Sequence, residues 1–152
     1  MYRFIRKRTA DLTSTRTFIH EVYKETWFSS AHRLRDYKGP CENLHGHNYR
    51  ARVYVGAAQL DPTGMVIDFK ILKKAMKEVC GPLDHTYLNE LAPFDEINPT
   101  AENICRYIFE EVDRRIRDGR VRVTRTLVWE TEGSCAVVTE PDIVGLFSGE
   151  FS

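Results

Sequence analysis

The sequence of 152 residues lacks an excess of charge of either sign, since its 22 lysines and arginines balance its 22 aspartates and glutamates. This balance gives no general electrostatic reason to expect a nucleic-acid or membrane partner. The chain also lacks the apolar segment of a secretion signal and any apolar run of the roughly 18 residues that a membrane span needs. We therefore expect a cytoplasmic protein without a membrane anchor.

Close pairs of cysteines are lacking as well. The four cysteines are scattered and include no Cys-x-x-Cys pair, which a structural zinc site often shows. Cys80 and Cys105 fall on the apolar faces of expected helices, so we interpret them as core residues. There is no internal repeat, and the length suits a single domain.

Acidic residues are scarce in the first 17 positions, which hold five basic residues and only one acidic residue. A transit peptide has a similar composition. We interpret residues 1–17 instead as a basic N-terminal extension, and we expect residues 18–152 to form one domain.

Four segments have the pattern of β-strands. Apolar and polar residues alternate over residues 18–32 and 45–57, and again over residues 121–130, and residues 134–139 complete a hairpin. His20 lies alone on the first segment, so we interpret it as a surface or packing residue.

Two segments between these strand pairs have helical periodicity. The first is expected to begin after Asp68, which suits an N-cap, and to stop at Gly81. The second is expected to be capped by Asn98 or Thr100, with Pro99 tolerated at its first position. The order ββααββ predicts an α+β domain with two helices on one face of a four-stranded antiparallel sheet.

Three of the five histidines lie near the turn between the first two strands. Side chains alternate across a strand, so His45 and His47 point to the same face, and a strand ending at His32 could add a third imidazole. Three neutral imidazoles suit a tetrahedral Zn²⁺ whose fourth position stays open, which is typical of a catalytic site. The alternative is that these are ordinary half-buried strand histidines.

The run of arginines between residues 114 and 122 is a second feature with two interpretations. A basic run can bind RNA, but Asp118 interrupts it, and the end of a helix favours cations. We interpret it as a solvated helix end.

Several short motifs occur together in a characteristic order. They are Cys-x-x-x-His-Gly-His at 41–47 with His32 upstream, Leu-Asp-His at 83–85, Pro-Thr-Ala-Glu-Asn at 99–103 and Trp-Glu-Thr at 129–131. With these motifs, the chain resembles the 6-pyruvoyltetrahydropterin synthase / 6-carboxytetrahydropterin synthase family over about residues 20–140. The spacing of three residues between Cys41 and His45 resembles the spacing in the bacterial 6-carboxytetrahydropterin synthases of queuosine biosynthesis.

The resemblance implies a fold, an assembly and an activity. The fold would be the tunnelling fold, in which the sheets of several subunits join into a barrel. The resemblance implies a homo-oligomer, a hexamer, with active sites at subunit interfaces. Joining also removes the exposed sheet edges. The activity would be that of a zinc-dependent lyase that converts 7,8-dihydroneopterin triphosphate to 6-carboxy-5,6,7,8-tetrahydropterin. Release of a 6-pyruvoyl product, or of 6-hydroxymethyl-dihydropterin as a second product, is an alternative, as is a module that binds pterin without turnover.

The resemblance also assigns roles to the catalytic residues. His32, His45 and His47 would bind Zn²⁺, which acts as a Lewis acid on the substrate side chain. Cys41 would be the general base, and His85, oriented by Asp84, would be its partner. Because Asp84 and His85 are adjacent, their pairing requires a loop or a helix end.

Four further residues are candidates for substrate binding. Glu130 would accept paired N–H bonds from the pterin ring, and Glu132 competes for this role. Thr100 and Glu102 belong to the 99–103 motif, although Glu102 could also complement the helix dipole. Glu42 follows Cys41 and resembles a glutamate that related proteins use to release the 6-hydroxymethyl product, or it is an exposed turn residue.

Overall fold

Two long strands form the frame of the fold. The computed structural model describes residues 18–143 and 145, so the extension of residues 1–17 lies outside the described residues. Strand β1 (His20–His32) and strand β2 (His45–Ala57) pair antiparallel along their whole length, from His20 opposite Ala57 to His32 opposite His45. The predicted second strand is confirmed at both ends.

Three more strands complete the sheet, whose order is β3-β1-β2-β4-β5. Strands β4 (Arg122–Thr131) and β5 (Ser134–Thr139) form the predicted hairpin. Strand β3 (Thr86–Tyr87) pairs parallel with the end of β1 and was not predicted, because two residues show no periodicity. The four predicted strands are confirmed, and the described sheet has five.

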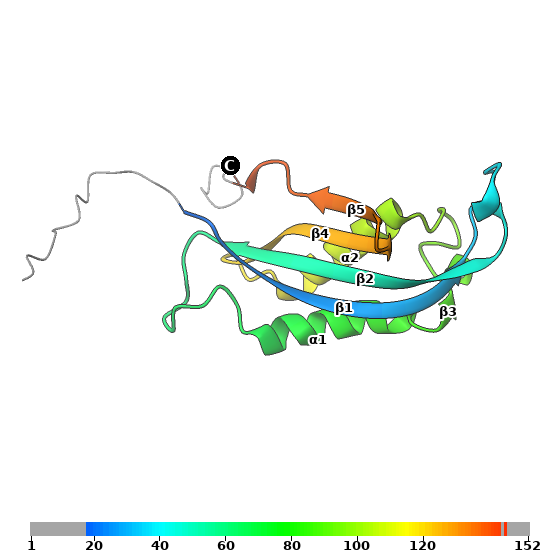
Figure 1. Cartoon of the computed structure of the whole chain (residues 1–152). Coiled ribbons are helices and arrows are strands. Elements are labelled where there is room, and N and C mark those ends of the chain that lie inside the picture. The colour runs from blue at the N-terminus through cyan, green and yellow to red at the C-terminus, as the bar shows by residue number, and fades with distance from the viewer. Residues whose placement is uncertain (1–17, 144, 146–152) are drawn as a thin grey trace, which may run out of the picture.

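Helices α1 (Phe69–Cys80) and α2 (Ala101–Ile116) cover one face of the sheet, as Figure 1 shows. Asp68 caps α1 as predicted, accepting the Lys70 N–H at 2.7 Å. Thr100 caps α2 by accepting the Asn103 N–H at 3.2 Å. The alternative cap Asn98 is wrong because its side chain binds another segment, and Pro99 precedes the helix.

The core lies between this sheet face and the helices. Strand β2 contributes every second residue, including the fully buried Val53 and Val55, and α2 contributes Ile104 and Ile108. Each such side chain contributes about 1.5–3 kcal/mol when buried. Cys80 and Cys105 are buried there as well, as predicted.

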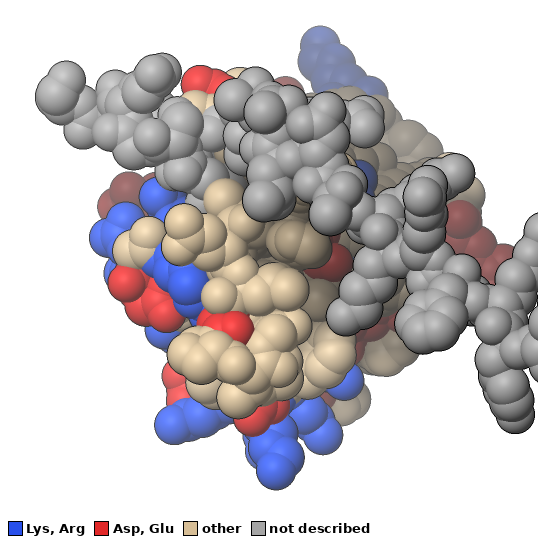
Figure 2. Space-filling model, turned by 90° about the vertical axis from the view of Figure 1, so that its left-hand side faces the viewer, with Lys and Arg blue, Asp and Glu red and all other residues tan. Residues whose placement is uncertain are grey.

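The arginines near the end of α2 are paired within the chain. Arg114 and Arg115 pair with Glu111, and Arg122 pairs with Asp113. Figure 2, which views the molecule from this end, shows Lys and Arg interspersed with Asp and Glu. The interpretation of these arginines as a solvated helix end is therefore favoured over an RNA-binding site. Among the described residues, no helix is long and apolar enough to cross a membrane.

Candidate metal and active site

The three histidines that flank the turn between β1 and β2 lie close together, His32 at the end of β1 and the other two at the start of β2. His32 pairs directly with His45 across the β1–β2 ladder, and His47 lies two residues further along β2. Their ring centroids are 4.5 to 5.2 Å apart. One ring nitrogen of each lies within 4.8 Å of the others, so the cluster could hold a metal ion.

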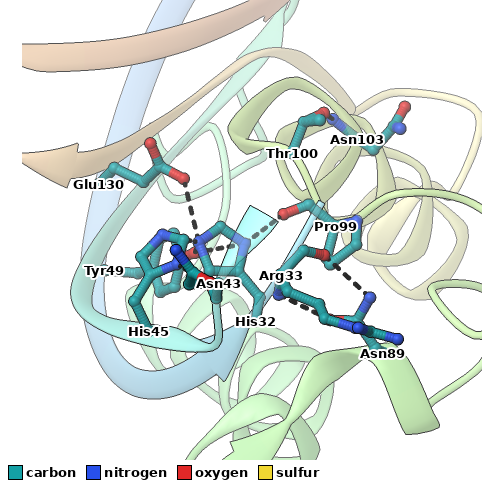
Figure 3. Close-up of polar contacts among 10 residues, drawn as sticks. All are labelled: His32, Arg33, Asn43, His45, Tyr49, Asn89, Pro99, Thr100, Asn103 and Glu130. Carbon is teal, nitrogen blue, oxygen red and sulfur yellow. Dashed lines mark hydrogen bonds and ion pairs between the residues drawn. The ribbon is translucent and has the colours of Figure 1, made fainter. Parts of the chain in front are cut away.

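Two backbone carbonyls orient the imidazoles. His32 Nδ1 lies 2.7 Å from the Pro99 carbonyl oxygen, and His45 Nδ1 lies 2.8 Å from that of Asn43 (Figure 3). A carbonyl only accepts hydrogen bonds, so both neutral rings carry their proton on Nδ1 and a lone pair on Nε2. Such an outer contact on a ligating histidine is typical of metal sites.

The two Nε2 atoms face each other at 3.1 Å. Two lone pairs repel unless a proton or a cation lies between them. Two imidazoles on one tetrahedral Zn²⁺ have nitrogens about 3.3 Å apart, given bonds of about 2.0–2.1 Å. The spacing of the His32 and His45 nitrogens is therefore compatible with two ligands of one tetrahedral metal ion such as Zn²⁺.

Burial favours the neutral imidazole that a metal requires. His32 is 1% exposed. Its burial lowers the pKa of His32, and the nearby His45 and His47 lower it further, against the opposing effects of the Pro99 carbonyl and Glu130. Deprotonation for metal binding is therefore less costly at His32 than in water.

Glu130 and Tyr49 lie directly beside the histidines. Glu130 Oε1 is 3.7 Å from His32 Nε2, and the hydroxyl of the fully buried Tyr49 is 3.2 Å from the same nitrogen. Burial first, and then the charge and a hydrogen bond of Glu130, raise the pKa of Tyr49, so the phenol stays neutral. Tyr49 was not predicted as a site residue, although period-two alternation places it on the same face as His45 and His47.

One cavity of about 340 Å³ brings five of the ten predicted site residues together. Its lining includes Cys41, Thr100, Glu102, Glu130 and the metal-cluster residue His32. These residues come from four separate segments of the chain. Cys135 of β5 is a second thiol on this lining that the sequence analysis did not single out.

Cys41 lies in the short 3-10 helix η1 (Pro40–Glu42). Its side chain is half-buried, and its carbonyl accepts the Leu34 N–H at 2.8 Å. Glu42 is exposed and is not part of the cavity lining that contains Cys41.

Asp84 and His85 form a pair in the irregular backbone just before β3. Adjacent residues can pair only in such a segment. His85 has a φ of 54°, and its Nε2 lies 3.7 Å from Asp84 Oδ2. The other carboxylate oxygen accepts the Ser29 N–H at 2.8 Å, which fixes Asp84 to β1. A non-glycine residue at positive φ is strained and is often found at functional sites.

Within one chain, His85 does not join Cys41. His85 lines a different cavity, of about 490 Å³, together with the metal-cluster residue His47. Neither Asp84 nor His85 lines the Cys41 cavity in the described part of the chain. The prediction that His85 is the partner of Cys41 is therefore not realised by a single subunit.

A helix-backed, largely antiparallel sheet that gathers three histidines beside a thiol and a carboxylate defines a candidate metalloenzyme. The comparisons with known proteins specify its class. Residues 21–141 match the family of 6-pyruvoyl tetrahydropterin synthase, and the chain belongs to this family.

Relatives and solved structures agree with this assignment. The 6-carboxy-5,6,7,8-tetrahydropterin synthase of a Synechocystis strain is 41% identical over 97 residues, which cover 60% of this chain and 74% of the relative. Human 6-pyruvoyl tetrahydrobiopterin synthase is 34% identical over 132 residues, with coverages of 77% and 89%. The structure of Caenorhabditis elegans 6-pyruvoyl tetrahydropterin synthase is similar with a TM-score of 0.73 at 30% identity, covering 84% of this chain and 99% of that chain. The protein is thus an enzyme of the tetrahydropterin synthase family with its fold.

Proposed function

We propose that the protein is a zinc-dependent lyase that converts 7,8-dihydroneopterin triphosphate to 6-carboxy-5,6,7,8-tetrahydropterin in queuosine biosynthesis. The observation that carries the proposal is the convergence of His32, His45 and His47 beside a cavity that contains both Cys41 and Glu130. The similarity to the Synechocystis relative, which is named for this reaction, supports the choice of product.

His32, His45 and His47 would hold the zinc ion. Bound there, Zn²⁺ would supply Lewis acidity to oxygens of the substrate side chain and so acidify neighbouring C–H and O–H groups. The carbonyls of Pro99 and Asn43 keep the Nε2 atoms of His32 and His45 available.

The remaining residues of the Cys41 cavity would bind the substrate and move protons. The Cys41 thiolate would accept a proton from the substrate side chain. Glu130 would accept N–H bonds from the pterin ring, the planar recognition that suits a carboxylate. Thr100 and Glu102, at the first turn of α2, line the same cavity and would complete the ring contacts.

His85 would complete the site from a neighbouring subunit. The outer edge of β1 pairs only at Ser30 and Ala31 among the described residues, so most of this edge is available to another strand. Such an edge favours assembly into a closed barrel. We propose a homo-oligomer, a hexamer by resemblance, in which Asp84 and His85 of one subunit face the Cys41 of the next.

The test is to incubate zinc-loaded protein with 7,8-dihydroneopterin triphosphate and to identify the pterin by mass spectrometry. A 6-carboxy product with acetaldehyde is expected. A 6-pyruvoyl product would instead place the chain with the human and nematode relatives, whose names carry that product. A 6-hydroxymethyl product would assign a role to Glu42, which is exposed beside Cys41. Zinc binding without turnover would favour a pterin-binding module.

We further propose that residues 18–152 form the catalytic domain, that residues 1–17 are an extension, and that the enzyme acts in the cytoplasm. Cell fractionation and a variant lacking residues 1–17 test these points. Full turnover of the shortened variant is expected.

A further inference from the structure

Two asparagine side chains hold the segment that follows β1. Asn89 accepts the Arg33 N–H at 2.9 Å and donates to the Arg33 carbonyl at 2.9 Å (Figure 3). Asn98 accepts the Arg35 N–H at 2.8 Å and donates to the Arg35 carbonyl at 2.9 Å. Each amide supplies one acceptor and one donor to a single residue, as a neighbouring strand would in a sheet.

The segment of residues 33–35 connects the metal cluster to the thiol. Arg33 directly follows His32. Leu34 lies between Arg33 and Arg35 and donates its N–H to the Cys41 carbonyl at 2.8 Å. Asn89 therefore acts on the histidine side of the segment. Asn98 acts on the side that carries Cys41.

Asn98 is also linked to the orientation of His32. Its own carbonyl accepts the Thr100 N–H at 2.8 Å and the Asn103 side-chain amide at 2.8 Å. These contacts fix the peptide that leads into Pro99, whose carbonyl binds His32 Nδ1 at 2.7 Å. One side chain thus ties the loop before α2 both to the Cys41 segment and to a metal-cluster histidine.

We propose that Asn89 and Asn98 are positioning residues that hold His32 and Cys41 in their working geometry. The inference rests on the proposed roles of the metal and the thiol. Asn89 maintains the position of His32, so its loss weakens the metal site. Asn98 maintains both groups, so its loss also misplaces the thiol.

The experiment compares Asn89→Ala and Asn98→Ala with the parent protein. Zinc affinity is measured by competition with a chelator, and both variants are expected to bind zinc about 10- to 100-fold more weakly, as for other residues that support metal ligands. Excess zinc should restore the turnover of Asn89→Ala but not that of Asn98→Ala.

A second readout does not depend on turnover. Iodoacetamide alkylation of Cys41, which is half-buried, is quantified by mass spectrometry as the ratio of modified to unmodified Cys41. Asn98→Ala should raise this ratio about threefold or more because local opening exposes Cys41. Asn89→Ala should leave it near the parental value.

The control is Val79→Ala, which removes a buried side chain of α1 that lines neither site cavity. It lowers overall stability and should change neither zinc affinity nor the alkylation ratio. If Asn98→Ala does not fold, Asn98→Asp is used, which keeps the acceptor for Arg35 but loses the donor.

Parental zinc affinity and alkylation in both asparagine variants would overturn the proposal, as would equal changes in Val79→Ala. Rescue of both variants by zinc would overturn the separate role of Asn98. If the parent lacks turnover while zinc affinity and alkylation still shift as expected, the positioning roles stand and the proposed reaction fails.

Discussion

Replacement of Glu130 by glutamine tests two roles of one carboxylate. The change keeps the shape of the side chain and removes its charge, 3.7 Å from the Nε2 atom of His32. Opposite unit charges about 4 Å apart attract by about 1 kcal/mol in water and about 4 kcal/mol near a protein surface. The Glu130 side chain is 26% exposed, so solvent screening places its effect on a bound cation toward the lower value.

We therefore expect Glu130→Gln to weaken zinc binding about tenfold, which corresponds to about 1.4 kcal/mol. The effect on substrate should be larger. Hydrogen bonds to a charged group contribute about 1.5–3 kcal/mol, and the glutamine amide would also turn a donor toward the N–H groups of the pterin. With saturating zinc, KM should rise about 10- to 150-fold.

The assays are chelator competition for zinc and steady-state turnover at saturating zinc. The control is Glu132→Gln, which removes the same charge two residues further along, at the exposed turn after β4. If Glu130→Gln keeps zinc affinity and KM within about threefold of the parent, both roles are wrong. A larger rise in KM for Glu132→Gln would transfer the pterin role to Glu132.

Four further predictions concern the thiol, the metal and the assembly. Cys41→Ala should keep its zinc but lose about 10²- to 10⁴-fold in turnover, the usual contribution of a proton-transfer group, and turnover within threefold of the parent would refute the role. His45→Ala should lose both zinc and activity, and undiminished zinc by metal analysis would count against ligation. Burial lowers the pKa of His32, so the unfolded chain binds a proton below about pH 6.5 that the folded chain does not, and urea unfolding of the metal-free protein should show stability falling as the pH decreases through that value. Inactive Cys41→Ala and His85→Ala proteins should regain partial activity when unfolded and reassembled together, whereas no recovery in verified mixed oligomers would indicate that each site is built from one subunit.

The sequence was most informative where the pattern was long. Alternation over 45–57 predicted both ends of β2 and the shared face of His45 and His47, because a 13-residue strand repeats its pattern many times. The pattern left two alternatives for the cap of α2. Asn98 and Thr100 both suit an N-cap, and only the folded chain shows that the Asn98 amide is bound to Arg35.

Other features depend on contacts between distant segments and leave no local pattern. The Pro99 carbonyl that orients His32 is 67 residues away in sequence. Glu130 points toward the histidines at the place where the β4–β5 register shifts, between Trp129 and Thr131. The motif that contains His85 was recognisable, but its separation from the Cys41 cavity follows from the tertiary structure alone.

The register of β1 against β2 links the metal site to the core. His32 lies opposite His45 in the same ladder that places Phe28 opposite Tyr49 and Val22 opposite Val55. A slip of one residue would move a whole strand face from the core to the open side of the sheet, so core burial strongly opposes it. The β1–β2 pairing therefore brings the histidines together by itself. Only the segment after His32, where the pairing ends, needs other contacts to fix its position. The side chains of Asn89 and Asn98 supply that support at the first residues after His32. Core substitutions that preserve the register should consequently leave zinc affinity unchanged, whereas small changes at these two asparagines should not.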